Sequence, residues 1–252
     1  MKDDLYQRTR QSWEDIWKQE SSIADELEVL KEPRTRDQFD LFPLYLSRDG
    51  YILEAGSGLG ATMIVLREQG FKLIGLDYAE QALQQCRAHD PTLPLQVGDV
   101  HALPYADNSL YGYLSFGVFE HFAHGMLPAL REAYRVLVPG GTLVLTIPYP
   151  NLVHLAVRTR RKLMGQSILT DDDFYESTYR RVDLERALET IGFEVVVAKP
   201  TSHSFTFWGL GGPFRAAGYY RTSPLAELMG RVSKAVFPWA FNYTTMIIGR
   251  KP

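Results

Sequence analysis

The sequence predicts an α/β fold: a three-layer, doubly wound sheet of seven mostly parallel strands, capped by helical insertions. From residue 51 onward, short apolar runs alternate with segments of helical periodicity, which is typical of a parallel sheet with helices on both faces. The first apolar run, 51–54, breaks into a turn with glycine at 56, 58 and 60 and then enters a helix. A ligand can lie close to such a turn because glycine has no Cβ, and the helix that follows offers unpaired N–H groups.

The predicted elements follow one another in a regular order. Ahead of the sheet, helices are expected at 4–30 and 35–46, and Ser22 offers a cap that is followed by acids. Strands are expected at 51–54, 71–76, 93–97, 109–116, 142–147, 193–198 and 243–249. Further helices are expected at 59–69, 79–88, 127–138, 152–165 and 182–191. Pro139-Gly140-Gly141 is expected to close the helix that precedes the fifth strand.

The whole chain is expected to form a single domain with three kinds of part. These are an N-terminal helical cap at 1–47, a ligand-binding core at 48–150, and cap insertions at 151–181 and 201–242 within the single domain 1–252. Trp13 and Trp17 are expected to pack in the core from the first helix, and the alternative is a lid over the ligand. The second insertion is rich in glycine and aromatic residues and is assigned no element. Two interpretations of it stay open, a pocket for a lipophilic substrate and a small satellite core.

Composition narrows the class of protein. The chain has 252 residues, of which 45% are apolar and 23% charged, as in ordinary soluble globular proteins. Its one cysteine, Cys86, excludes an internal disulfide and a cysteine-based zinc site. No apolar run reaches the roughly 18 residues of a membrane span. Because the N-terminal segment is polar and resembles no secretory signal, a cytoplasmic location is expected.

The net charge of −3 is unevenly distributed along the chain. Residues 151–252 carry 14 Lys and Arg against 9 Asp and Glu, whereas residues 1–150 carry 13 against 21. One interpretation is a solvated surface without further meaning. The other is a basic face for an anionic substrate or a membrane surface.

Acidic residues occur at the ends of three predicted strands: Glu54, Asp77 and Asp99. In an open parallel sheet, ligands bind at the carboxyl ends of the strands, so these side chains are expected around one site. Asp77 lies 19 residues beyond Gly58, where an acid can accept both hydroxyls of a ribose. That spacing by itself fits both NAD and S-adenosylmethionine.

Five ordered motifs distinguish these ligands. They are Glu-Ala-Gly-Ser-Gly-Leu-Gly at 54–60, Leu-Asp-Tyr at 76–78, Gly-Asp-Val at 98–100, Phe-Gly-Val-Phe-Glu-His-Phe at 116–122 and Leu-Val-Pro-Gly-Gly-Thr-Leu at 137–143. Together they resemble the class I S-adenosylmethionine-dependent methyltransferases, in the small-molecule branch often called methyltransferase type 11. The resemblance covers about 50–150 closely, and 182–198 and 243–249 more loosely. It implies the Rossmann-like methyltransferase fold, with 243–249 as its antiparallel seventh strand.

The resemblance also implies roles for individual residues. The Ala55 backbone, Gly56 and Gly58 would approach the methionine part of S-adenosylmethionine, and Glu54 would support this loop and the amino group. Asp77 would bind the ribose, with Tyr78 against the adenine. Asp99 would accept from the adenine amino group, Val100 would donate its backbone N–H, and Phe116 would lie beside the methionine moiety. The cofactor has an ammonium and a sulfonium group but no phosphate, so acids near the loop are tolerated. For each residue a helix cap, a surface charge or simple packing is the alternative.

On the substrate side, His121 is the candidate general base, and a structural histidine that caps the following helix is the alternative. Some quinone-pathway O-methyltransferases of this family have Glu-x-x-Glu-His here and bind a divalent metal. This chain has Gly117-x-x-Glu120-His121, so one ligand is missing and no metal is predicted. Pro148-Tyr149-Pro150-Asn151 has the wrong order and position for the motif of nucleic-acid amino methyltransferases, so a nucleic-acid substrate is not expected.

The predicted function is methyl transfer from S-adenosylmethionine to a small-molecule acceptor, lipophilic or aromatic in character. The alternatives are an NAD-dependent oxidoreductase and a catalytically silent module that binds the cofactor. The predicted helix 152–165 is amphipathic, with a basic cluster at 158–162. We expect it to pack its apolar side on the domain; peripheral contact with an anionic membrane is the alternative. The sequence leaves the oligomeric state open.

Overall fold

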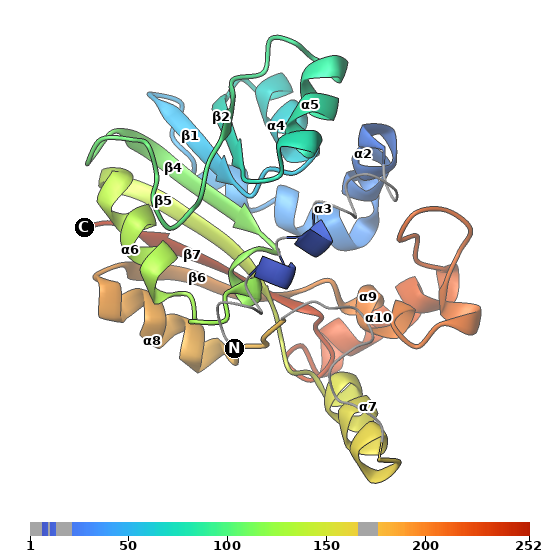
Figure 1. Cartoon of the computed structure of the whole chain (residues 1–252). Helices are drawn as coiled ribbons and strands as arrows, with labels where there is room; N and C mark the ends of the chain where they lie inside the picture. The colour runs from blue at the N-terminus through green and yellow to red at the C-terminus, as the bar shows by residue number, and fades with distance from the viewer. Residues whose placement is uncertain (1–6, 10, 14–21, 166–175) are drawn as a thin grey trace.

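The sheet sets the architecture of the chain. The computed structural model describes residues 7–9, 11–13, 22–165 and 176–252 (Figure 1). The strands are β1 (Tyr51–Ala55), β2 (Lys72–Asp77), β3 (Leu95–Val97), β4 (Leu110–Phe116), β5 (Leu137–Pro148), β6 (Glu194–Thr201) and β7 (Thr244–Arg250). They form one seven-stranded sheet in the order β3-β2-β1-β4-β5-β7-β6. β7 pairs antiparallel with both of its neighbours and the remaining pairs are parallel, so the predicted fold class is confirmed.

Helices cover both faces of this sheet. On one face, α4 (Ala61–Glu68) and α5 (Glu80–His89) pack over Ile52, Leu73 and Val144. On the other, α6 (Leu127–Val136) and α8 (Arg181–Ile191) pack over Leu53, Tyr113 and Ile247. Neighbouring strand residues point to opposite faces, which is the expected period of two. The sheet is therefore the middle layer of three, and the carboxyl ends of its parallel strands meet at one edge.

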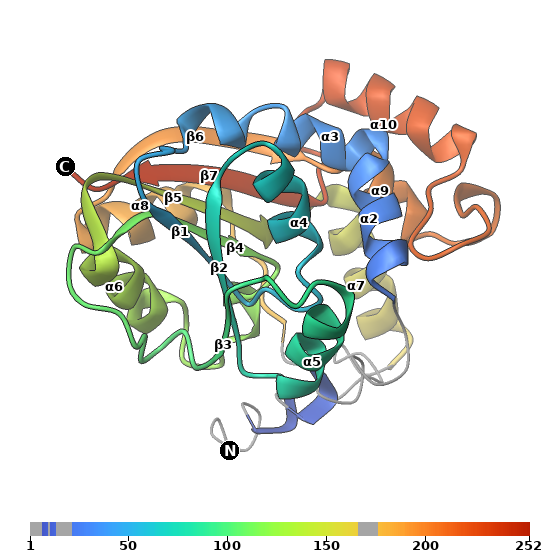
Figure 2. The same cartoon turned by 90° about the horizontal axis from the view of Figure 1, so that it is seen from above.

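The described N-terminal helices lie beside this edge. α2 (Ile23–Lys31) lies next to α4 and α5 (Figure 2). Its start is the predicted cap: the Ser22 hydroxyl accepts from the Asp25 N–H at 3.2 Å, and the Ser22 N–H donates back to the Asp25 carboxylate at 3.2 Å. The rest of the expected helix 4–30 includes only 7–9 and 11–13 among the described residues, so the prediction for Trp17 lies outside them.

The helix expected at 35–46 is two shorter elements, α3 (Pro33–Phe39) and a 3₁₀ turn η1 (Phe42–Tyr45). Pro43 explains the break, because it has no N–H to donate to the carbonyl four residues earlier, while it is tolerated in the first turn of η1.

The prediction that Pro139-Gly140-Gly141 closes a helix was wrong. α6 ends at Val136, and these residues belong to the first part of β5. Gly140 has φ +79°, its N–H donates to the Lys251 carbonyl at 2.7 Å, and the Lys251 N–H donates to the Gly141 carbonyl at 3.0 Å. A partner 110 residues away in sequence thus holds this segment in the sheet, which the local pattern does not reveal.

Residues 201–242, for which the sequence predicted no element, contain α9 (His203–Trp208), the 3₁₀ turn η3 (Gly212–Phe214) and α10 (Pro224–Val236). α10 starts with a common N-terminal capping pattern, which the sequence analysis missed because the segment is rich in glycine and aromatic residues. The Ser223 hydroxyl accepts from the Ala226 N–H at 3.2 Å, and Pro224 occupies the first helical position.

Candidate cofactor and acceptor site

The glycine turn after β1 folds over the end of β2. The N–H groups of Gly56 and Ser57 both donate to the Leu76 carbonyl, at 2.8 and 3.1 Å. Gly56, Gly58 and Gly60 have φ of +78°, +49° and +76°, a region that residues with a Cβ avoid. A Cβ at Gly56 would lie 2.4 Å from the Val118 side chain, so Val118 packs directly on the turn.

Asp77 fastens this turn to the segment after β2. The buried carboxylate accepts from the Gly58 N–H through Oδ2 and from the Ala79 N–H through Oδ1, both at 2.8 Å. Burial raises the pKa of Asp77, and the N–H groups of Ala79, Gly58 and Tyr78 oppose that rise. Asp77 is therefore a structural anchor of the turn as well as the candidate ligand for a ribose.

Glu54 is buried in β1 beneath the turn. The Thr62 hydroxyl and the Met63 N–H hydrogen-bond to its carboxyl, while Oε2 has no partner among the described residues. Burial raises its pKa to about 8, and Glu26 of α2 and Asp77 add to the rise. A buried acceptor without a partner normally belongs to a bound water, ion or ligand, and a cation suits it best because three acids converge here.

Asp99 and Val100 follow β3 at the same edge. The Asp99 carboxylate accepts from the His101 N–H and lies against His101 Nδ1, both at 2.8 Å. The Val100 N–H donates to no acceptor among the described residues. A depression of about 340 Å³ adjoins them, lined by Asp99, His101, Phe122, Ala123, His124 and Pro128. The expected contact of Asp99 with an adenine stays a prediction.

The remaining predicted cofactor residues take part in packing. Tyr78 packs beside Ile23 and Leu59, and the Phe116 ring centroid lies 5.4 Å from that of Phe42. The Ala55 carbonyl accepts from the Ser115 hydroxyl at 2.9 Å. Each lies where β1, β2 or β4 ends, so packing and cofactor contact are compatible, and the cofactor roles stay predictions.

His121 lies in a 3₁₀ turn, η2 (Phe119–His121), that follows β4. Its half-buried ring meets that of Trp13 edge-on, with 5.3 Å between the ring centroids. It does not occupy the N-cap position of the next helix, α6, which is Met126. The ring contact with Trp13 is compatible with a structural role, and the role as a base stays a prediction.

A group of residues lies near His121, none of which the sequence analysis assigned as a site residue, although Glu120 belongs to the motif 116–122 and Phe205 to the aromatic insertion 201–242. We call Arg34, Glu120, Phe205 and Tyr243 the acceptor cluster. Glu120 is buried, Oε2 of its carboxyl has no partner among the described residues, and burial raises its pKa well above the ordinary range. The Arg34 guanidinium lies 4.3 Å from the Phe205 ring centroid, and its buried Nε likewise lacks a partner in the described structure.

Tyr243 connects the two sides of the acceptor cluster. Its ring meets Phe205 edge-on at 4.8 Å, and burial and the nearby Glu176 and Glu120 raise the pKa of its phenol. The Tyr243 carbonyl accepts from the Tyr149 N–H at 2.9 Å, just beyond the end of β5. The cluster therefore lies at the sheet edge that carries the glycine turn, and it combines aromatic walls with unsatisfied polar groups. No sequence spacing could have indicated it, because its members come from four separate parts of the chain.

Comparisons with known proteins agree with this geometry. Residues 53–145 match the family model described as "Methyltransferase domain". A probable S-adenosylmethionine-dependent methyltransferase of Mycolicibacterium smegmatis is 31% identical over 57% of this chain and 52% of its own length. The ubiquinone/menaquinone biosynthesis C-methyltransferase UbiE of Dinoroseobacter shibae is 32% identical over 58% of this chain and 66% of its own. The chain spans about half the length of the first two curated relatives it matches.

Solved structures share the fold across nearly the whole chain. A chain of the complex between the Haloferax volcanii Trm112 methyltransferase activator and its methyltransferase partner aligns with a TM-score of 0.64. The alignment covers 95% of this chain and 97% of that one at 18% identity. At this identity the likeness concerns the fold alone.

The close contact of Val118 with the glycine turn predicts a cost for any side chain at Gly56. Gly56→Ala should lower the free energy of unfolding by about 1–2 kcal/mol through its positive φ, and by about 1–3 kcal/mol more through the clash. Gly140→Ala is the matched control, with φ +79° and no atom within 4 Å of the added Cβ. Urea unfolding measures both. The double variant Gly56→Ala/Val118→Ala should recover part of the loss, and equal losses at Gly56 and Gly140 would contradict the clash.

Proposed function

We propose that this chain, which belongs to the class I S-adenosylmethionine-dependent methyltransferases, transfers a methyl group from S-adenosylmethionine to a small-molecule acceptor with apolar or aromatic surface. The observation that carries the proposal is the glycine turn held by Asp77 above the buried, partly unpaired carboxyl of Glu54. This arrangement fits a ligand that has a ribose and a cationic end.

On the cofactor side, S-adenosylmethionine supplies a methyl group activated by its sulfonium. Glu54 offers its unpaired oxygen to the amino group, and Asp77 retains acceptor capacity for ribose hydroxyls. Asp99 and the Val100 N–H would hold the adenine, with Tyr78 beside it. Ala55, Gly56, Gly58 and Phe116 would hold the methionine end. A dinucleotide fits less well, because its pyrophosphate would approach Glu54, Asp77 and Glu26.

On the acceptor side, Tyr243 offers an aromatic ring beside Phe205, whose own faces are covered by Arg34 and Trp208, and Arg34 Nε and Glu120 Oε2 lack partners among the described residues. Burial raises the pKa of Glu120 well above the ordinary range, which favours the neutral carboxyl, a form that can donate a hydrogen bond. Arg34 would stabilise negative charge on the reacting atom. A small molecule with an oxygen on an aromatic or quinone ring suits Tyr243, Arg34 and Glu120, and the relative named for quinone biosynthesis supports this class.

His121 is the group we assign to proton removal. It is half-buried and neighbours Glu120 in η2, at the end of β4. An imidazole is neutral at physiological pH unless its surroundings shift it, so it can accept a proton from a phenol. We do not assign this step to Glu120, because its burial favours the neutral carboxyl over the carboxylate. The absence of a metal at Gly117 and the cytoplasmic location stay predictions from sequence.

The proposed activity is tested by binding and turnover on the whole chain. Calorimetry should show that S-adenosylhomocysteine binds and that NADH does not. Incubation of a small-molecule extract with isotopically labelled S-adenosylmethionine should transfer the label to a product found by mass spectrometry. Binding of NADH alone would contradict the proposal. Cofactor binding without any labelled product from extract or from a panel of phenols and quinols would favour the silent module.

Glu54 predicts a pH dependence of cofactor binding. Its pKa is raised from 4.5 to about 8 in the free protein, whereas a bound ammonium favours the carboxylate. Affinity for S-adenosylhomocysteine should therefore rise between about pH 5 and 8, by up to roughly tenfold per unit, and level off above it. Calorimetry in buffers of different ionisation enthalpy should detect proton release on binding.

Two variants test whether this pH dependence of cofactor binding comes from Glu54. Glu54→Gln should flatten it, and Glu26→Gln should leave most of it, although burial raises the pKa of Glu26 to about 7. The folding stability of the free protein changes with pH in the opposite direction to the cofactor affinity. The neutral Glu54 favours folding below pH 4.5, and that contribution to stability is lost as the pH rises through about 8. Equal affinity at pH 6 and pH 8.5 would show that Glu54 does not face the cofactor.

The assignment of His121 predicts a selective loss of turnover. With the acceptor identified as above, His121→Ala should lower kcat by about 10²–10⁴-fold while S-adenosylhomocysteine binding holds. Glu120→Gln keeps a donor in place and should retain kcat within about tenfold. His89→Ala, at the exposed end of α5, is the control. If His121→Ala lowers the melting temperature but spares turnover per folded molecule, its role is to pack against Trp13.

A further inference from the structure

α7 (Leu152–Leu163) extends from the body of the molecule and buries none of its residues (Figure 1). Its apolar side chains are largely exposed: Leu155 by 57%, Leu163 by 83% and the following Met164 by 58%. The expectation that this helix packs its apolar side on the domain was therefore wrong. An exposed apolar face of this kind marks an interaction surface.

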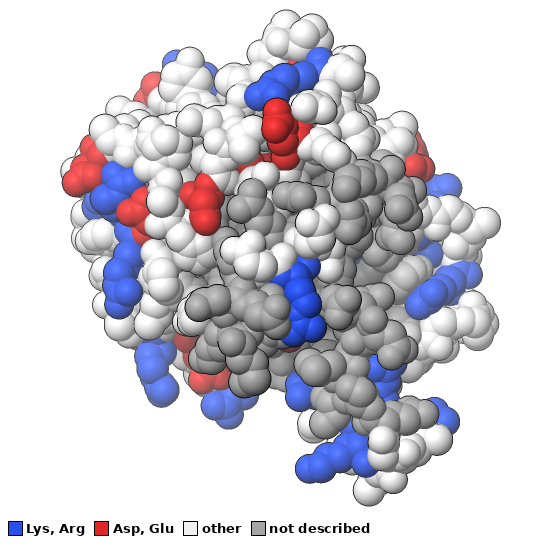
Figure 3. Space-filling view, in the orientation of Figure 1, with Lys and Arg blue, Asp and Glu red and all other residues white. Residues whose placement is uncertain are grey.

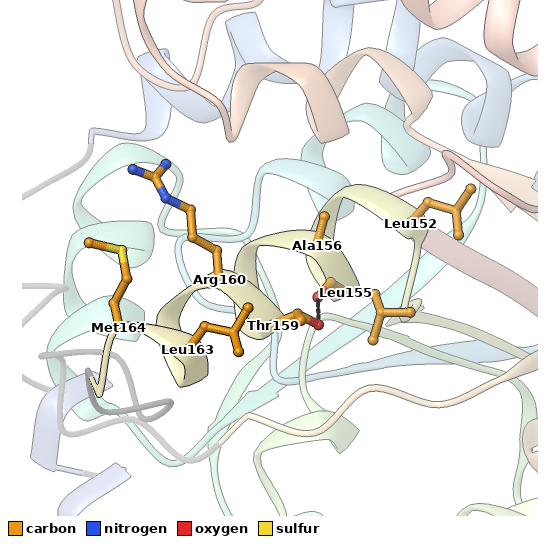
Figure 4. Close-up of a pocket in the computed structure, with 7 residues that line it drawn as sticks. All are labelled: Leu152, Leu155, Ala156, Thr159, Arg160, Leu163 and Met164. Atoms are coloured by element: carbon orange, nitrogen blue, oxygen red, sulfur yellow. Dashed lines mark hydrogen bonds between the residues drawn. The ribbon is translucent and has the colours of Figure 1, made fainter.

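The exposed side chains form one continuous stripe. Leu152, Leu155, Ala156, Thr159 and Leu163 recur at the spacing of a single helix face, and together with Arg160 and Met164 they line a depression of about 690 Å³ (Figure 4). The Thr159 hydroxyl donates to the Leu155 carbonyl at 2.8 Å, so its hydrogen bond is satisfied within the helix. The stripe therefore offers almost entirely apolar atoms to a partner.

Cations border this stripe. Residues 151–165 contain Arg158, Arg160, Arg161 and Lys162 and no acid. Within the described residues none of these four cations forms an ion pair. At 100° per residue, Arg160 and Lys162 lie on opposite sides of the stripe, within a quarter turn of Leu152. The space-filling view shows Lys and Arg side chains gathered around this end of the molecule (Figure 3).

We propose that α7 is a membrane-docking helix, which lies on an anionic phospholipid surface with Leu155, Leu163 and Met164 inserted and Arg160 and Lys162 at the phosphates. An interfacial helix lies in the membrane plane with its apolar face among the acyl chains and its cations at the headgroups. A second copy of the chain fits less well, because face-to-face packing would bring two four-cation clusters together. Among the residues the structure describes, no helix is long and apolar enough to span a membrane, so the contact is peripheral.

Vesicle co-sedimentation of the whole chain tests this proposal without reference to methyl transfer. The protein should sediment with vesicles of phosphatidylcholine containing about one third phosphatidylglycerol at low salt. It should bind at least about tenfold more weakly to pure phosphatidylcholine, and more weakly at moderate salt. No sedimentation with the anionic vesicles at low salt would overturn the proposal.

Three double variants separate the contributions of charge and apolar surface. Arg160→Gln/Lys162→Gln should weaken binding by about tenfold or more, because two headgroup contacts are lost. Lys72→Gln/Arg186→Gln removes the same charge from exposed sites elsewhere and should have little effect. Leu155→Gln/Leu163→Gln should abolish binding with all cations retained. Equal loss in the first two pairs would mean only general electrostatic attraction, and a dimer that the leucine variant dissociates would assign the face to a second copy; either result overturns the proposal.

Discussion

A single buried carboxylate connects the parts of the cofactor site. Asp77 accepts from Gly58 in the turn after β1 and from Ala79 at the start of α5, so two loops from neighbouring strands share one anchor. Positive φ at Gly56, Gly58 and Gly60 costs little only because these residues lack a Cβ, and the Asp77 bonds offset the entropy of ordering them. Without such an anchor the glycine turn would lose the shape that receives a ligand. The chain's own hydrogen bonds therefore fix the shape of the glycine turn.

The use of a carboxylate as the anchor makes the site acidic, and this acidity determines which ligands the site can bind. Burial raises the pKa of Glu54, Glu26 and Asp77, and Glu26 and Asp77 add to the rise at Glu54. With pKa values of about 8 and 7, Glu54 and Glu26 hold protons that neutralise part of this charge in the free protein. A ligand with a cationic end replaces those protons, whereas a ligand with phosphates would meet repulsion. Electrostatics thus separates two cofactors that a glycine motif and a ribose-binding acid do not distinguish.

The parts of the fold that depend on local sequence were predictable, and the parts that depend on distant partners were not. Apolar runs and glycine punctuation located all seven strands to within a few residues, except that β5 begins at Leu137. That exception arises because Gly140 and Gly141 pair with Lys251, far away in the chain. In the site, motif residues such as Asp77 and Glu54 could be selected from spacing. Arg34, Phe205 and Tyr243 could not, since only the closed sheet brings them together.

α7 is a second case in which the sequence predicts the helix but not its surroundings. The sequence established that the helix is amphipathic and basic, yet periodicity cannot say whether an apolar face meets the protein or its surroundings. In the structure that face is exposed. Much of the excess positive charge in the C-terminal part of the chain lies on the same helix. Residues 151–252 contain five more Lys and Arg than Asp and Glu. Four of these basic residues lie in the segment 151–165, which contains no acid. Few kinds of binding partner suit a helix that has both an exposed apolar stripe and a concentrated positive charge. The proposed docking on an anionic membrane satisfies both, and it would bring the domain that carries the acceptor cluster to a phase in which lipophilic small molecules dissolve.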